Sequence, residues 1–245
     1  MKKILIVLML CFVFFSSFSA LAANYRALET RAERVPKQYE ESLPKLVNYL
    51  IKPYENNEEK KAYVLMAWIV YHIDYDDYKS DVITQSASWR RKNIPRVNTG
   101  DVFETRAGVC QDIAALYQRM LGLAGIDSVV VTGYAGYGVT RRTMNDNRHA
   151  WNAAKINGTW ALLDPTWAMQ GATKVFQNVN TRSQHAREMK QRERNTTKTN
   201  KARKNRNVDD RWFMTDPKEM IKTHFPDDPK WQLLPVEKRI GSFLK

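Results

Sequence analysis

HAWNAAKINGTWALLD, residues 149–164, joins two apolar-rich runs through Asn157 and Gly158. An Asn-Gly pair between such runs is the strongest short-range signal for a β-hairpin closed by a two-residue type I′ turn. A turn at these positions also fixes the register, because residues that face each other across the strands then have numbers summing to 315. The stretch therefore predicts an antiparallel pair of strands and specifies which residues meet.

This register brings a histidine and an acid together. It places Trp151 opposite Asp164, and His149 opposite Thr166. Since side chains alternate between the two faces of a strand, these four residues would share one face of the hairpin. His149 and Asp164 become diagonal neighbours, about 7–8 Å apart at the backbone and within side-chain reach. In that geometry a carboxylate holds one imidazole nitrogen and leaves the other as a base.

A helix-like stretch that begins with a cysteine lies before the hairpin in the sequence. GVCQDIAALYQRMLGLAGI, residues 108–126, has apolar residues at the spacing of an amphipathic helix, with Cys110 at its start. Free N–H groups and the positive end of the helix dipole lower the pKa of a thiol there. The same N–H groups would bind the oxyanion of an acyl group on Cys110, and Gly108 would allow another backbone to approach closely. SVVVTGY, residues 128–134, indicates a buried strand after this helix.

Two of these residues also have plainer interpretations. A lone cysteine is often a small buried hydrophobe, and Asp164 could simply begin a turn before Pro165. The combination of cysteine, histidine and acid nevertheless favours a nucleophile, a base and an orienting carboxylate at Cys110, His149 and Asp164. The two cysteines, Cys11 and Cys110, and the scattered histidines give no zinc-ligand spacing, so neither a metal nor another cofactor is expected.

The other histidines and tryptophans of interest are expected to pack. His72 ends an apolar stretch, residues 59–73, that indicates a helix buried on most faces. His224 is far in sequence from the cysteine and the hairpin, and is expected to be structural. The tryptophans of the hairpin region are also assigned to packing, with the first of them shielding the Asp–His pair from water: Trp151, Trp160 and Trp167.

RAGVCQDIAALYQRMLGLAGI and NRHAWNAAKINGTWALLDPTWA resemble the transglutaminase-like superfamily of papain-type cysteine enzymes. In that family a G-x-C opens a helix, an H-x-W-N begins one strand and a D-P-T-W ends the next. All three elements occur here in the same order. The tail FMTDPKEMIKTHFPDDPKWQLL resembles the C-terminal piece of the kyphoscoliosis-peptidase-like branch, so that the similarity covers roughly residues 40–170 and 208–234.

The resemblance implies an α+β, papain-like fold in which the nucleophile helix packs on an antiparallel sheet. It also implies acyl chemistry on a protein or peptide substrate, with Cys110 as nucleophile, His149 as general base and acid, and Asp164 as orienting carboxylate. Val109-Cys110-Gln111 stands where animal transglutaminases have Gln-Cys-Trp, which favours hydrolysis over cross-linking. Cross-linking of proteins to amines and a catalytically inactive binding module are the alternatives.

The first 22 residues have the pattern of an export signal. Lys2 and Lys3 precede an unbroken apolar run at 4–15, and an A-x-A cleavage pattern ends at Ala22. The run is shorter than the about 20 residues that span a bilayer, so a retained membrane anchor is the less favoured alternative. The sequence predicts a periplasmic or secreted protein, cleaved near Ala22, whose mature chain keeps Cys110 as its one cysteine.

The positive charge is concentrated in one segment. Of the formal net charge of +13, residues 182–206 contribute +8, from ten Lys and Arg against two Glu. The segment has no Tyr, Trp or Phe on which bases could stack, so nucleic acid is not favoured as a partner. A solvated insertion is the favoured interpretation, and an anionic envelope polymer or lipid surface is the favoured partner if the segment binds.

A composition of 43% hydrophobic residues supports a sizeable core. The long connection 74–105 lacks periodicity and is expected to form a wall of a cleft next to Cys110. The sequence specifies no oligomeric state. The predicted organisation is a signal peptide (1–22), an N-terminal arm (23–38), a catalytic core (39–171), a basic and flexible insertion (172–207) and a C-terminal piece packed on the core (208–245).

Overall fold

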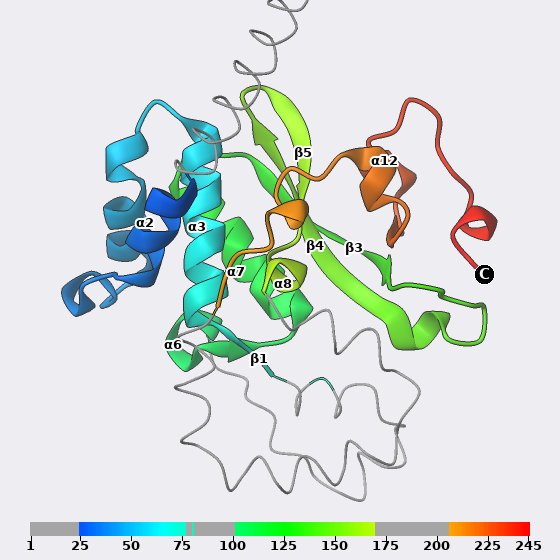
Figure 1. Cartoon of the computed structure of the whole chain (residues 1–245), viewed down its shortest axis with the longest axis horizontal. Coiled ribbons are helices and arrows are strands. Elements are labelled where there is room, and N and C mark those ends of the chain that lie inside the picture. The colour runs from blue at the N-terminus through cyan, green and yellow to red at the C-terminus, as the bar shows by residue number, and fades with distance from the viewer. Residues whose placement is uncertain (1–24, 77–79, 81–100, 170–205) are drawn as a thin grey trace, which may run out of the picture.

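The computed structural model describes residues 25–76, 80, 101–169 and 206–245 (Figure 1). The predicted signal peptide, most of the predicted cleft wall and all of the basic segment except Arg206 lie outside the described residues. Within the described part of the chain, no helix is long and apolar enough to cross a membrane.

The α-helices are α2 (Leu43–Ile51), α3 (Glu58–His72), α6 (Val102–Thr105), α7 (Cys110–Leu123), α8 (Pro165–Ala168) and α12 (Pro217–Met220). The strands are β1 (Asp74–Tyr75), β2 (Ala107–Gly108), β3 (Ser128–Ala135), β4 (Arg148–Ile156), β5 (Thr159–Leu163) and β6 (His224–Pro226). Short 3₁₀ turns occupy Lys37–Tyr39, Lys52–Tyr54, Met144–Asn147, Asp210–Trp212, Pro229–Gln232 and Ile240–Ser242.

Helices α2, α3 and α7 lie together on one side of the main sheet (Figure 1). Helix α3 begins after Asn57, whose side chain accepts the N–H of Lys60, and it is buried along most of its length, as its apolar sequence predicts. Helix α7 begins at Cys110, as predicted, and its apolar residues form the buried face that packs against α3 and the sheet: Ile113, Leu116, Tyr117, Met120 and Leu121.

The main sheet has the order β5-β4-β3-β6, and every neighbouring pair is antiparallel. The hairpin register is the predicted one, since Asn152 pairs with Leu163 and Ile156 pairs with Thr159. Asn157 and Gly158 have φ values of 51° and 79°, the left-handed conformation that a type I′ turn requires at both central positions. The packing of α7, which begins at Cys110, on an antiparallel sheet confirms the α+β fold class.

The hairpin ends earlier than its register alone predicts. Strand β5 stops at Leu163, and Asp164 is the N-cap of α8 with Pro165 at the first helical position. Proline has no N–H for a strand ladder, but its fixed φ suits the first residue of a helix. The expected pairing of His149 with Thr166 is therefore wrong, because Thr166 lies in α8 rather than on the strand.

Both ends of the described chain pack on this core. Residues 25–33, within the segment predicted as an arm, are helical, and Leu28 and Ala32 are fully buried. His72 packs as expected, with its ring stacked on Trp68 at a centroid distance of 5.1 Å and its Nε2 2.9 Å from the Ala32 carbonyl oxygen. In the C-terminal piece, strand β6 adds to the free edge of β3.

Gly133 makes the contact between β3 and β6 possible. It pairs with Pro226, and a Cβ atom at this position would overlap the Phe225 carbonyl oxygen and lie 2.8 Å from both Pro226 Cα and Trp151 Cη2. Only a residue without a side chain allows the two backbones to approach this closely. Gly133 thus sets the position of the C-terminal strand.

We expect Gly133→Ala to lower the free energy of unfolding by about 1–3 kcal/mol, the usual range for overpacking a buried site. Denaturant unfolding of the variant measures this loss. Gly122→Ala is the matched control, because a Cβ at Gly122, within α7, would meet nothing within 4 Å. That control should keep or slightly raise stability, since alanine is the better helix former. Equal stability of both variants would contradict this account of Gly133.

Candidate active site

Cys110 is the first residue of α7 and is half-buried. The backbone before it is held in two ways: β2 pairs with β1 in parallel, and the Val109 N–H donates to Asp112 Oδ2 at 3.0 Å. The space beside Gly108 is filled by side chains rather than by the backbone that the sequence led us to expect, because a Cβ there would lie 2.9 Å from Asp112 Cβ and Val102 Cγ2. These contacts fix where the sulfur lies.

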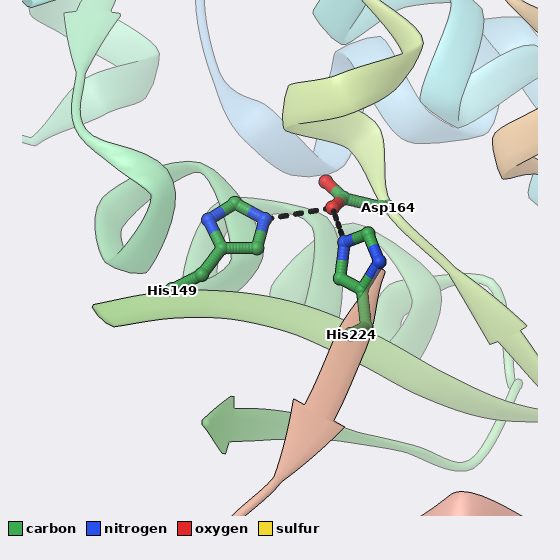
Figure 2. A group of neighbouring side chains, drawn as sticks. All are labelled: His149, Asp164 and His224. Atoms are coloured by element: carbon green, nitrogen blue, oxygen red, sulfur yellow. Dashed lines mark hydrogen bonds and ion pairs between the residues drawn. The ribbon is translucent and has the colours of Figure 1, made fainter. Parts of the chain in front are cut away.

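His149 and Asp164 are brought together as predicted. His149 lies near the start of β4, Asp164 caps α8, and both side chains are fully buried. His149 Nε2 is 2.7 Å from Asp164 Oδ2 (Figure 2). The early end of β5 therefore does not separate the pair, because Asp164 is the residue directly after the last paired residue, Leu163.

Cys110 is hydrogen-bonded to His149, and its sulfur also accepts the backbone N–H of Ala150. Because Asp164 holds Nε2 of His149, Nδ1 is the ring nitrogen available to the sulfur. The three residues singled out from the sequence thus form one continuous chain of contacts, from the start of a helix through a strand to a helix cap.

The two carboxylate oxygens of Asp164 have different partners. Oδ1 accepts the backbone N–H groups of Thr166 and Trp167, both at 2.9 Å, and so caps α8. Oδ2 faces the imidazole of His149. Asp164 therefore does both things that the sequence suggested. Its Oδ1 forms the turn before α8, and its Oδ2 is the partner of His149.

His224 is the residue that the sequence did not identify. Its Nε2 lies 3.0 Å from the same Oδ2 of Asp164 (Figure 2). Its Nδ1 lies 2.9 Å from Thr223 Oγ1. This histidine is far from the site in sequence but lies beside it in space, because β6 pairs with β3 and sets His224 opposite Ala135. Pairing between strands that are distant in sequence leaves no local sequence signal. The one feature that could have pointed to His224 was its position within an aromatic-rich tail.

Tryptophan rings surround the two imidazoles. Trp151 lies 6.0 Å from His149 and 5.2 Å from His224, measured between ring centroids. Trp167 lies 6.0 Å from His149 and 4.4 Å from His224, and Trp212 lies 5.3 Å from His224. These rings exclude water, which strengthens the electrostatic interactions inside. Trp160 packs elsewhere, against Trp231.

The pKa values of Cys110 and His149 move in opposite directions. Burial raises the pKa of Cys110, but the charge and hydrogen bond of His149 and the N–H of Ala150 outweigh it and hold that pKa below its usual range. Burial lowers the pKa of His149, but Asp164 and Cys110 raise it to about 10. Both shifts favour a thiolate beside an imidazolium at neutral pH.

The pKa shifts of Asp164 and His224 are consistent with a charged His149 beside the Cys110 thiolate. Burial raises the pKa of Asp164, but the two histidines outweigh it and hold that pKa well below its usual range. Burial lowers the pKa of His224 to about 4, although the hydrogen bond that His224 donates to Asp164 opposes this shift, so His224 is neutral at pH 7. A neutral imidazole has one N–H. Since a carboxylate only accepts, that N–H is on Nε2, and Nδ1 accepts the Thr223 hydroxyl.

His149, Asp164 and His224 are also a group, among the described residues, whose ligand atoms lie close enough to hold a metal ion, within 4.8 Å of one another. The nitrogen–oxygen separations of 2.7 and 3.0 Å are ordinary hydrogen-bond lengths, and hydrogen bonds account for the arrangement. The expectation that neither a metal nor another cofactor takes part stays a prediction.

The family model of the transglutaminase-like superfamily matches residues 44–165, which contain Cys110, His149 and Asp164. The chain belongs to the transglutaminase-like superfamily, as the sequence motifs led us to expect. The matched segment ends at the start of α8, so His224 and the rest of the C-terminal piece lie outside it.

Its curated relatives include the kyphoscoliosis peptidase of Homo sapiens, which is 27% identical over 233 residues, covering 93% of this chain and 29% of that protein. Hillarin of Drosophila melanogaster is 29% identical over 123 residues, covering 49% of this chain and 13% of that protein. The chain therefore spans less than a third of the length of either relative.

Solved structures with some similarity include a putative cysteine protease from Cytophaga hutchinsonii, 25% identical with a TM-score of 0.37, covering 54% of this chain and 40% of that one. The periplasmic domain of TgpA from Pseudomonas aeruginosa is 18% identical with a TM-score of 0.40, covering 62% of this chain and 52% of that one.

Proposed function

We propose that this protein is a cysteine-dependent acyl-transfer enzyme that hydrolyses peptide or amide bonds through a thioester on Cys110. The observation that carries the proposal is the chain of contacts from Cys110 through His149 to Asp164, in which the imidazole bonds the sulfur on one side and the carboxylate at 2.7 Å on the other. A nucleophile, a base and a group that orients the base are the parts that such catalysis needs.

The reaction has two halves. In the first, the Cys110 thiolate attacks the carbonyl carbon, the C–S bond forms, the C–N bond breaks, and His149 gives its proton to the leaving amine. In the second, neutral His149 takes a proton from water, the water oxygen attacks the thioester, and the C–S bond breaks to release the carboxylic acid. Asp164 keeps its charge throughout and holds the imidazole in one orientation. Backbone N–H groups at the start of α7 would bind the oxyanion.

A protein or peptide is the proposed substrate class, because the superfamily acts on carboxamide and peptide carbonyls. Export to the periplasm or the exterior is proposed from the sequence of residues 1–22, which lie outside the described part of the chain. Binding of an anionic envelope polymer or lipid surface through residues 182–206 likewise stays a proposal that rests on their charge.

The test is the pH dependence of iodoacetamide labelling at Cys110. In the wild type the pKa of the thiol is lowered, so labelling should be fast at pH 7 and be lost only as the pH falls through that lowered value. His149→Ala removes the opposing charge while burial, which raises the pKa, remains. Labelling at pH 7 should then fall by about 10-fold or more, since one pKa unit is a factor of ten in thiolate.

His72→Ala is the control for this experiment, because His72 packs on Trp68 in α3. Its labelling profile should match the wild type. Mass spectrometry of the Cys110 peptide, sampled between pH 4 and 10, gives the rates. An unchanged profile in His149→Ala would count against the role of His149.

The same residues would also serve transfer to an amine, because the thioester accepts either nucleophile. Incubation in ¹⁸O-labelled water with a labelled primary amine separates the two products. Incorporation of ¹⁸O into the released acid supports hydrolysis, and incorporation of the amine supports cross-linking. Absence of both products, with Cys110 still reactive, would favour a binding module.

A further inference from the structure

Two imidazoles share one oxygen of Asp164. His149 Nε2 and His224 Nε2 lie 2.7 and 3.0 Å from Oδ2 (Figure 2). Oδ1 accepts the two N–H groups of α8. A carboxylate has about four lone-pair sites, and all are used here. The second imidazole is therefore part of the environment that determines how strongly Asp164 acts on His149.

The position of His224 is fixed on every side. Its backbone pairs with Ala135 on β3, its Nδ1 bonds the Thr223 hydroxyl, and its ring lies 4.4 Å from Trp167 in an edge-on contact. The side chain is fully buried. Asp164 and His149 are ionisable groups that act on its pKa. His224 is thus held as a donor to Oδ2.

We propose that His224 is a positioning residue that shares Oδ2 with His149 and so limits how tightly Asp164 holds the proton of His149. The inference rests on the proposed function. An oxygen that accepts two N–H groups forms a weaker bond with each than it would form with one. A general acid is most effective when its pKa lies near the operating pH, so a carboxylate that held the His149 proton too strongly would slow its delivery to the leaving amine.

This role separates two steps that depend differently on His149. Alkylation of Cys110 by iodoacetamide needs only the thiolate. Cleavage of an amide also needs His149 to give its proton to the departing nitrogen. His224 should therefore matter for amide turnover and little for alkylation, whereas a merely structural residue would affect both in parallel.

His224→Phe removes the donor and keeps a ring, and His224→Gln keeps an N–H donor on a flexible side chain. We expect kcat for an amide substrate to fall in His224→Phe by on the order of 10-fold to 100-fold, with KM unchanged, because general acid–base catalysis contributes about 10²–10⁴-fold. The iodoacetamide rate should stay within about twofold of the wild type on the same argument. His224→Gln should recover most of the lost turnover. His72→Phe, a histidine packed on Trp68, is the matched control and should change neither rate.

The proton NMR signal of the His149 Nε2–H gives a second readout. It should move downfield in His224→Phe, because Oδ2 then accepts one donor and that bond strengthens. His224→Leu, which also lacks the donor, gives the same readouts if His224→Phe does not fold. A parallel fall of both rates, an unchanged amide rate, or an unmoved signal would overturn the inference. If the wild type cleaves no amide the proposed function fails, but the signal still tests the shared oxygen.

Discussion

Replacing Cys110 with alanine is expected to abolish amide turnover and all covalent labelling of the catalytic core. The variant lacks the proposed nucleophile, and with it the thioester through which the proposed reaction passes. In hydrolases that use a serine in this role, loss of the nucleophile costs about 10⁶-fold in kcat, and an effect of that order is expected here. The substitution removes one half-buried atom, so the free energy of unfolding should change by no more than about 1 kcal/mol.

Gly122→Ala supplies the matched control, because Gly122 lies in the same helix as Cys110 and a Cβ there would meet nothing within 4 Å. This control should keep both the turnover and the labelling of the wild type. Steady-state hydrolysis of a fluorogenic peptide and mass spectrometry of the labelled protein measure the two effects. Turnover that survives in Cys110→Ala would show that another group carries the reaction, and the proposed function would then be wrong.

The fold could be predicted where local sequence determines it. The Asn157-Gly158 turn fixed the hairpin register to the residue, and apolar spacing fixed the helix that starts at Cys110. The point at which β5 ends was not predictable from the register, because it depends on competition between strand pairing and helix capping. Asp164 and Pro165 together favour the cap, so the ladder stops at Leu163.

The sequence predicted three residues of the candidate site, but it did not predict the fourth, His224. Cys110, His149 and Asp164 are each marked by a local motif. His224 reaches the site through the pairing of β6 with β3, which depends on the absence of a side chain at Gly133. No pattern within either segment indicates that pairing, since β6 has three residues and no usable periodicity.

The position of His224 also changes how the C-terminal piece is understood. The family match ends at residue 165, before this piece begins, and yet β6 supplies the second imidazole on the Asp164 carboxylate. The core alone would leave one lone pair of a buried carboxylate oxygen without this donor, which is costly in a site that excludes water. The C-terminal piece therefore completes the hydrogen bonding of the site as well as covering the sheet edge.

Asp164→Asn is expected to retain the fold and to lose about 10⁴-fold in kcat, the size of effect seen when the orienting acid of a catalytic triad becomes an amide. The amide oxygen can still accept the N–H groups of Thr166 and Trp167, which places the NH₂ group where Oδ2 was. Its two hydrogens then point at Nε2 of His149 and of His224. Both imidazoles must accept there and carry their proton on Nδ1.

This tautomer disables His149, because Nδ1 faces the sulfur and cannot take a proton while it carries one. Iodoacetamide labelling at pH 7 should therefore fall together with turnover, unlike the split expected for His224→Phe. The ¹⁵N shifts of the His149 ring report the change of tautomer directly. Asp164→Ala is the contrasting variant: it leaves four buried N–H groups, two of α8 and two of the imidazoles, without their acceptor and should cost about 3–5 kcal/mol of stability. Turnover within tenfold of the wild type in Asp164→Asn, or unchanged ¹⁵N shifts, would mean that Asp164 serves α8 as a cap and does not orient the base.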